Sequence, residues 1–266
     1  IRDIGVTGVQ TCALPISIVK VGPAQGEART VVEATGKYLS PGFIDAHSHS
    51  DLPLVQNPTA DSKVMQGVTT EVIGQCGSSG APRRLGLYKQ EGADDDDGMP
   101  HWTDMASYIK VLEDQGISVN VVPLVGHGSV RRQVMGVENR APDQNELNLM
   151  KKLVDAAMEQ GAFGMSTGLI YVPGKYSNTD EVIELAKVVA KHRGYYFTHI
   201  RNEGVKLLEA LQEAIDIGFA AGVPVQVSHF KVMGEANWGM VEHSIAMVEK
   251  ARKDGLDITA DQYPYI

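Results

Sequence analysis

Hydrophobic residues fall into short apolar runs that alternate with longer amphipathic stretches from residue 43 onward. The runs predict seven strands, at residues 43–45, 69–73, 118–125, 163–167, 195–199, 225–229 and 258–261. The stretches between them predict helices at roughly residues 103–115, 143–160, 179–192, 204–221 and 240–254. A repeated strand–helix series is typical of a parallel sheet, and about 250 residues is the usual size of a (β/α)8 barrel. We therefore expect an α/β protein with a TIM-type barrel.

The two ends of the sequence do not fit this series. Residues 1–16 have no initiator Met and no clear period, so we interpret them as a non-native linker or adapter-derived segment. Residues 17–40 contain two short β-rich runs, and we expect them to form part of a small β-sandwich domain. The barrel is expected to occupy residues 41–266 and to lack its last strand, because only a few residues follow the seventh predicted strand.

Composition narrows the class of partner. The 266 residues are 43% hydrophobic and 21% charged, as in an ordinary globular protein, and the formal net charge is -9. An acidic chain is poorly suited to nucleic acid or anionic membranes, so we expect a small-molecule substrate. No apolar run reaches the length of a membrane helix. Two cysteines are too few for a disulfide framework, which favours a reducing, cytoplasmic location.

Candidate metal ligands follow the predicted strands. His47 and His49 end the first strand and are two residues apart, so their imidazoles point the same way. Cys76 follows the second strand, and His199 and His229 end the fifth and sixth. The carboxyl ends of barrel strands form the rim where active sites are built. Imidazoles together with one thiolate suit Zn²⁺ best.

Each of these residues also has an explanation without metal. Paired histidines occur in exposed loops, and a lone Cys is usually a small buried hydrophobic residue. His199 and His229 could be strand-end residues held by ordinary hydrogen bonds. The metal interpretation rests on five such residues at one rim.

Six segments resemble the N-acyl-D-amino-acid deacylase (D-aminoacylase) family of the amidohydrolase superfamily. They are PGFIDAHSHSD (41–51), GVTTEVIGQCGSSGAP (67–82), GMSTGLIYVPGKYS (164–177), THIRNEG (198–204), VSHFKVMGEANWG (227–239) and TADQYPY (259–265). The resemblance implies a barrel with zinc held tightly by Cys76, His199 and His229. It also implies a second, weaker metal position at His47 and His49.

The same resemblance implies roles in substrate binding. Lys231 matches a lysine that pairs with the substrate carboxylate, and Tyr263 matches a tyrosine that holds the same group. Tyr171 and Arg201 either line the pocket or serve the structure. The family's general base is an aspartate at the end of the eighth strand, which we expect beyond residue 266. Asp261 ends the seventh strand and is not its equivalent.

The expected reaction is zinc-dependent hydrolysis of N-acyl-D-amino acids to a D-amino acid and a carboxylate, with the chain as given nearly inactive. Three alternatives remain open. One is another amide hydrolase of the superfamily, and a second is a metal-free hydrolase in which Cys76 is the nucleophile beside a histidine base. The third is a non-catalytic metal-binding fragment.

Overall fold

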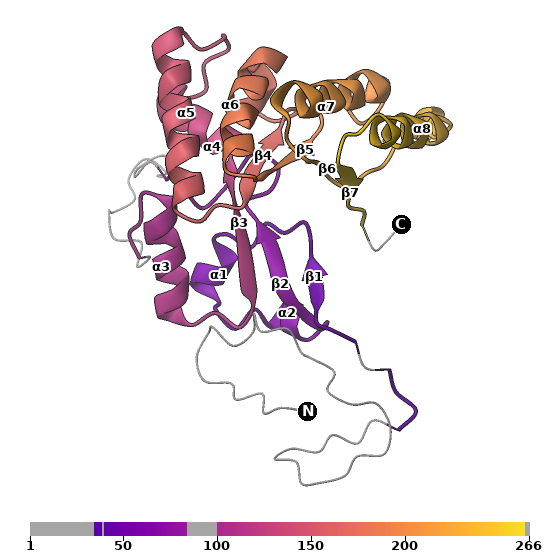
Figure 1. Cartoon of the computed structure of the whole chain (residues 1–266). Coiled ribbons are helices and arrows are strands. Elements are labelled where there is room, and N and C mark those ends of the chain that lie inside the picture. Colours follow the sequence, from indigo (N-terminus) through magenta and orange to yellow (C-terminus); the bar gives the residue numbers. More distant parts are fainter. Residues whose placement is uncertain (1–34, 39, 84–99, 264–266) are drawn as a thin grey trace.

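Seven parallel strands form one curled sheet in the computed structural model, which describes residues 35–38, 40–83 and 100–263 (Figure 1). The strands are β1 (Phe43–Asp45), β2 (Val68–Ile73), β3 (Asn120–Gly126), β4 (Gly164–Gly168), β5 (Tyr195–His199), β6 (Val225–Val227) and β7 (Ile258–Ala260). Each strand pairs with the next one in the chain, so the order is β1-β2-β3-β4-β5-β6-β7. The sheet is the seven-strand series of a TIM-type barrel, which confirms the predicted fold class. The linker expected at residues 1–16 and the partial β-sandwich domain expected at residues 17–40 stay predictions, since residues 1–16 and most of 17–40 lie outside the described residues.

Helices connect the strands and cover one face of the sheet (Figure 1). They are α1 (Pro53–Gln56), α2 (Asp61–Val64), α3 (Met105–Gln115), α4 (His127–Met135), α5 (Gln144–Glu159), α6 (Thr179–Lys191), α7 (Leu207–Ala221) and α8 (Met240–Lys253). Two 3₁₀ turns, η2 (Gly174–Tyr176) and η3 (Glu235–Asn237), lie in the loops after β4 and β6. No helix in the described ranges is long and apolar enough to cross a membrane.

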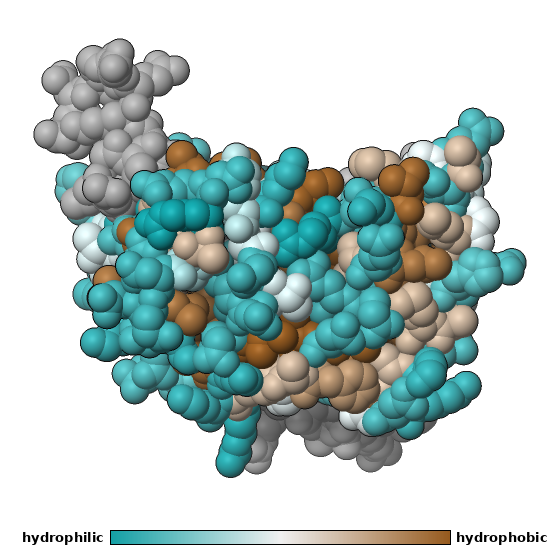
Figure 2. Space-filling model, turned by 90° about the horizontal axis from the view of Figure 1, so that it is seen from above, coloured by the Kyte–Doolittle hydropathy of each residue, from teal (hydrophilic) through white to brown (hydrophobic). Residues whose placement is uncertain are grey.

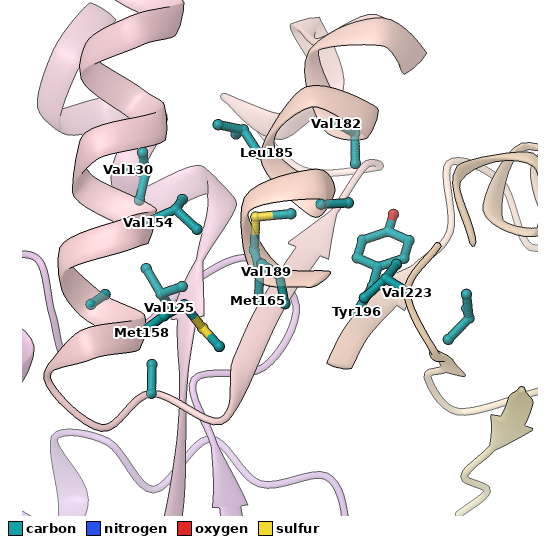
Figure 3. Close-up of a cluster of buried hydrophobic side chains, with 14 of the residues drawn as sticks. Val125, Val130, Val154, Met158, Met165, Val182, Leu185, Val189, Tyr196 and Val223 are labelled. Carbon is teal, nitrogen blue, oxygen red and sulfur yellow. The ribbon is translucent and has the colours of Figure 1, made fainter. Parts of the chain in front are cut away.

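The main core lies between the helices and the sheet (Figure 3). Val154 and Met158 of α5 pack there with Val189 of α6 and with strand residues such as Met165. Adjacent strand residues point to opposite faces, so Val125 joins this core while its neighbour Leu124 joins a smaller cluster. That smaller cluster lines the inner face of the sheet. Because both faces bury apolar side chains, the strands read as continuous apolar runs rather than alternating ones.

Side-chain caps fix the start of the longer helices. Asp143 accepts a hydrogen bond from the backbone N–H of Glu146, and the Glu146 side chain accepts from the backbone N–H of Asp143. Asn178 caps α6 in a similar way, through the N–H of Glu181. Both starts agree with the boundaries expected from the sequence. Such a cap stabilises a helix by about 1 kcal/mol.

Helix α4 was not predicted from the sequence. Its residues have few apolar side chains in a helical period, yet six of its nine residues are buried. The buried members include His127 and Arg131, which both contact Glu181 of α6. The buried face of α4 is thus partly polar, so the sequence lacks the apolar stripe by which an amphipathic helix is recognised.

Outward faces of the helices are mainly polar. Seen from above, the surface is mostly hydrophilic, with separate hydrophobic groups between the polar side chains (Figure 2). The described residues therefore form a layered β/α unit whose chemistry-bearing side chains gather at the carboxyl ends of the strands.

Candidate metal centre

Loops at the carboxyl ends of β1, β2, β5 and β6 bring five potential ligands together. His47 and His49 follow β1, Cys76 follows β2, His199 is the last residue of β5, and His229 lies two residues beyond β6. Parallel strands end at the same edge of a sheet, so these side chains meet although they are up to 182 positions apart in sequence. The structure therefore assembles all five residues singled out in the sequence.

Cys76, His199 and His229 form the tighter group. Sγ of Cys76 lies 3.6 Å from Nδ1 of His199 and 3.7 Å from Nε2 of His229. Tetrahedral zinc with bonds of about 2.3 Å to sulfur and about 2.0 Å to nitrogen separates S and N ligands by about 3.6 Å. The two imidazole nitrogens are closer, at 2.8 Å, and would move apart by about 0.5 Å around such an ion. The donor types and spacing fit zinc.

His47 and His49 form a second group with the same cysteine. Nε2 of His47 lies 3.4 Å from Sγ of Cys76, and the three potential ligand atoms lie within 4.8 Å of one another. His49 is exposed, whereas His199 and His229 are buried. The group of His47, His49 and Cys76 is therefore more open to solvent than the group of Cys76, His199 and His229.

The surroundings of Cys76 and His199 favour the neutral forms of these two side chains. Burial raises the pKa of the Cys76 thiol to about 12, and the charges of Asp261 and Glu203 act in the same direction. Burial lowers the pKa of His199 to about 4; Glu203 opposes this shift, while His229 and Lys231 reinforce it. A divalent cation reverses the preference of the thiol, because it stabilises the thiolate directly.

Two of the potential ligands have unusual backbone conformations. Cys76 has φ of 53° and His229 has φ of 37°, in the left-handed region that non-glycine residues rarely adopt. Strain of this kind costs about 1–3 kcal/mol per residue and concentrates at functional sites. The surrounding chain holds Cys76 closely: a Cβ on Gly168 would lie 2.1 Å from the carbonyl oxygen of Cys76. The cysteine loop therefore depends on close backbone packing against β4.

Lys231 lies beside the cluster with a partner that the sequence did not reveal. Its Nζ is 2.7 Å from Oε1 of Glu203 and 5.2 Å from the ring centre of Tyr263. The ring of Tyr263 also stacks on His229, with centroids 5.7 Å apart. Lys231 and Tyr263 thus contact each other and both border His229.

Tyr171 and Arg201 are placed differently from each other. The half-exposed ring of Tyr171 packs edge-on against His199, with centroids 4.7 Å apart, so it borders the cluster. Arg201 makes a two-pronged ion pair with Glu213 of α7, at 2.9 Å for both contacts, and donates to the carbonyl oxygen of Lys175. Of the two explanations left open by the sequence, Arg201 fits the structural one better.

A hollow of about 240 Å³ opens beside Cys76 and is lined by His49, Tyr171 and Arg132 among others. A neighbouring hollow of about 210 Å³ also includes His49 and Arg132. Arg132 lies on α4. Because α4 was not predicted from the sequence, the position of Arg132 beside the candidate ligands was not predicted either. The two hollows leave room for a small molecule next to the candidate ligands.

Glu203 and Asp261 are the acidic residues closest to the histidines. Glu203 is buried in the loop after β5, and its Oε1 lies 2.8 Å from Nδ1 of His229. Asp261 accepts a hydrogen bond of 2.5 Å from the backbone N–H of His229 and lies 3.4 Å from Nδ1 of His47. Asp261 therefore helps to shape the His229 loop. A single Glu in an Asn-Glu-Gly loop looks like a solvated charge in sequence, which is why Glu203 was missed.

A curled parallel β/α sheet with imidazoles and a thiol at the carboxyl ends of its strands is the architecture of metal-dependent hydrolases of the barrel class. The chain belongs to the Amidohydrolase family, whose model matches residues 30–263. This membership confirms the resemblance found in the sequence.

Two curated proteins are similar to the chain over nearly its whole length. The chain is 36% identical to an N-acyl-D-glutamate deacylase of Alcaligenes xylosoxydans xylosoxydans, over 99% of this chain and 53% of the relative. It is 35% identical to a D-aminoacylase of the same organism, over 99% of this chain and 53% of that protein. The chain thus spans about half the length of the curated relatives it matches.

Solved structures agree with the sequence relatives. A crystal structure of D-aminoacylase matches with a TM-score of 0.77 and 36% identity, over 85% of this chain and 48% of the other. An N-acyl-D-glutamate deacylase from Bordetella bronchiseptica, complexed with zinc and a phosphonate inhibitor, also matches with a TM-score of 0.77. Its identity is 37%, over 84% of this chain and 47% of that chain.

Proposed function

We propose that the chain carries the metal- and carboxylate-binding part of a zinc-dependent N-acyl-D-amino-acid deacylase. The reaction is hydrolysis of the amide bond to a free D-amino acid and a carboxylate. The observation that supports it most is the placement of Cys76 Sγ 3.6 Å and 3.7 Å from nitrogens of His199 and His229 at the strand ends. The names of the relatives point to the same substrate class.

Bound zinc would polarise the amide carbonyl and make a water molecule nucleophilic near neutral pH. In this proposal Cys76, His199 and His229 hold the tight site, and His47 and His49 serve the weaker one. Lys231 and Tyr263 hold the substrate α-carboxylate, which fixes one face of the Cα and selects the D enantiomer. Tyr171 lines the pocket beside His199.

The general base is assigned to no described residue. The proposal keeps the expectation of an aspartate beyond residue 266. Asp261 fits that role poorly, because its carboxylate is already hydrogen-bonded to the backbone of His229 and to the side chain of Gln226.

A metal-free cysteine hydrolase is less well supported. Such an enzyme needs a thiolate, whereas the surroundings of Cys76 raise its pKa to about 12. Chelation distinguishes the two mechanisms, since loss of activity that zinc restores is expected only for the metal enzyme.

The rest of the proposal follows from composition. The substrate is a small molecule rather than nucleic acid or membrane, given the net charge of -9. A cytoplasmic location, inferred from the small number of cysteines, is part of the same proposal.

The experiment measures release of D-glutamate, D-aspartate and D-leucine from their N-acetyl derivatives, with the L enantiomers as controls. It uses the 266-residue chain and the same chain extended by the coding sequence that follows residue 266, each with and without zinc. We expect D-selective, zinc-dependent turnover in the extended protein and very low turnover in the shorter one. Turnover that survives chelation, or equal turnover of L and D substrates, would overturn the proposal.

A further inference from the structure

Glu203 contacts both His229, a candidate zinc ligand, and Lys231, the proposed partner of the substrate carboxylate. It lies in the loop between β5 and α7 and is only 5% exposed. One carboxylate oxygen, Oε1, is 2.8 Å from Nδ1 of His229 and 2.7 Å from Nζ of Lys231. A single buried oxygen thus contacts both groups.

The loop that carries Glu203 is held from several sides. Its carbonyl oxygen accepts a 2.7 Å hydrogen bond from the backbone N–H of Met233, which ties it to the loop after β6. The side chain of Asn202 accepts from the backbone N–H groups of Gly204 and Lys206. These bonds fix the position of the carboxylate before any ligand binds.

The contact with His229 sets the orientation of its ring. Nδ1 of His229 lies 2.8 Å from Oε1 of Glu203, so the tautomer with its proton on Nδ1 donates to this carboxylate and leaves Nε2 able to bind a metal. That nitrogen points to Sγ of Cys76 and Nδ1 of His199, where a metal ligand is needed. A carboxylate that accepts from the far nitrogen of a ligating histidine both fixes the ring and makes it more basic.

The contact with Lys231 sets a second group at the same time. A lysine ammonium has three donors, and the bond to Glu203 uses one of them. Nζ also lies 3.1 Å from Nδ1 and 3.4 Å from the carbonyl oxygen of His229, so Glu203 and His229 together hold the ammonium group. Without Glu203, the lysine would keep its charge but lose the shortest of these contacts.

We propose that Glu203 is a positioning residue that orients His229 for metal binding and Lys231 for the substrate carboxylate. The inference rests on the proposed function, because it takes His229 as a zinc ligand. It adds a residue that links the metal site to the carboxylate site through one oxygen.

The test is the zinc affinity of the 266-residue chain, measured by competition with a chromophoric chelator. Glu203→Ala removes the acceptor, whereas Glu203→Gln keeps an amide oxygen that can still accept from Nδ1. We expect zinc affinity to fall about 10–100-fold in the alanine variant, with the glutamine variant in between. Circular dichroism of each metal-free variant shows whether the fold is retained.

Glu213→Gln is the matched control. Like Glu203, Glu213 is a carboxylate with a cationic partner, although it is only partly buried, and it contacts Arg201 and Thr179 rather than a candidate ligand. Its substitution should leave zinc affinity within about 2-fold of the unmodified chain. Equal loss of affinity in Glu203→Ala and Glu213→Gln would overturn the inference, since both would then act through general destabilisation.

The outcomes separate this inference from the proposed function. If the unmodified chain binds no zinc, the metal centre is wrong and this inference with it. If the unmodified chain binds zinc and folded Glu203→Ala binds it equally well, only the role of Glu203 is wrong. In the extended enzyme saturated with zinc, a higher KM for the N-acyl-D-amino acid in Glu203→Gln supports the link to Lys231, and an unchanged KM contradicts it.

Discussion

Sγ of Cys76 lies 3.4 Å from Nε2 of His47, so the thiol after β2 contacts a histidine after β1 as well as the histidines at the carboxyl ends of β5 and β6. Both groups of potential ligands share this one sulfur atom. A thiolate can bind two metal ions at once, whereas each imidazole nitrogen binds one. Cys76 is therefore the residue that the two groups of potential ligands have in common among the described residues.

Replacing Cys76 with Ala should reduce zinc binding at both positions. Loss of a direct ligand costs more than loss of a residue hydrogen-bonded to a ligand, which costs about 10–100-fold in affinity. The measurement is the zinc content after dialysis against a weak chelator. His192→Ala is the control, because His192 pairs with Asp155 away from the site. Full zinc content in Cys76→Ala would contradict the shared-ligand arrangement.

Replacing Lys231 with Met should raise KM for N-acyl-D-amino acids in the extended enzyme. A hydrogen bond to a charged group contributes about 1.5–3 kcal/mol, which corresponds to a change of about 10–100-fold. The thermal midpoint should change little by comparison, because Lys231 is partly exposed. Lys187→Met, on the outer face of α6, provides the control. Unchanged kinetics would remove Lys231 from the substrate site.

Glu181 is expected to be important for stability rather than catalysis. Its two carboxylate oxygens lie 2.8 Å from Nε2 of His127 and 2.5 Å from Nη1 of Arg131, and all three side chains are buried. Removing one partner of a buried pair leaves a charge without compensation, so Glu181→Gln should lower the free energy of unfolding by about 3–5 kcal/mol.

Urea denaturation measures this loss, with Glu184→Gln on the same helix as the control. Glu184 pairs with Lys151 and Lys187 at the surface, where such pairs contribute about 0–1 kcal/mol. Similar losses in the two variants would show that burial of the Glu181 network has no special effect.

The buried carboxyl group of Asp51 should make the stability of the protein depend on pH. Burial raises its pKa to about 6, although hydrogen bonds from the N–H groups of Gly80 and Gly74 oppose the shift. The folded state then holds a proton that the unfolded state releases near pH 4. Stability from this group is complete below about pH 4 and is lost as the pH rises through about 6.

Comparison of the unmodified chain with Asp51→Asn isolates the contribution of the Asp51 carboxyl group to stability. The free energy of unfolding of the unmodified chain, minus that of the variant, should fall by up to about 3 kcal/mol between pH 4 and pH 7. The midpoints of urea denaturation across this range provide the values. A difference that stays flat or increases with pH would mean that the two N–H donors outweigh burial.

The sequence predicted the strand series because each strand is a short apolar run bounded by turn residues. All seven strands appear in the structure with ends within about three residues of those expected. Helix α4 was missed for the opposite reason, since His127 and Arg131 are buried polar residues whose partner Glu181 is 50 or more positions away. Hydrophobic periodicity indicates a helix that buries apolar side chains, but it does not indicate a helix that buries an ion pair.

The candidate ligands could be predicted, but their supporting residues could not. Strand order alone brings Cys76 and His199 to one edge, because consecutive parallel strands end together. The contact of Glu203 with His229 depends instead on how two loops fold over that edge. Loop conformation has no short-range period, so a single glutamate there carries no visible signal in the sequence.

Gly168 is the last residue of β4 and has no side chain that could reach the site. A methyl group at this position would nevertheless lie 2.1 Å from the carbonyl oxygen of Cys76. Even Gly168→Ala would push the sulfur out of place. In a saturation-mutagenesis screen for activity, this position should therefore tolerate substitution as poorly as the ligand itself. A map of intolerant positions would then extend well past the residues that touch metal, and would trace the backbone packing that holds the cysteine in its left-handed conformation.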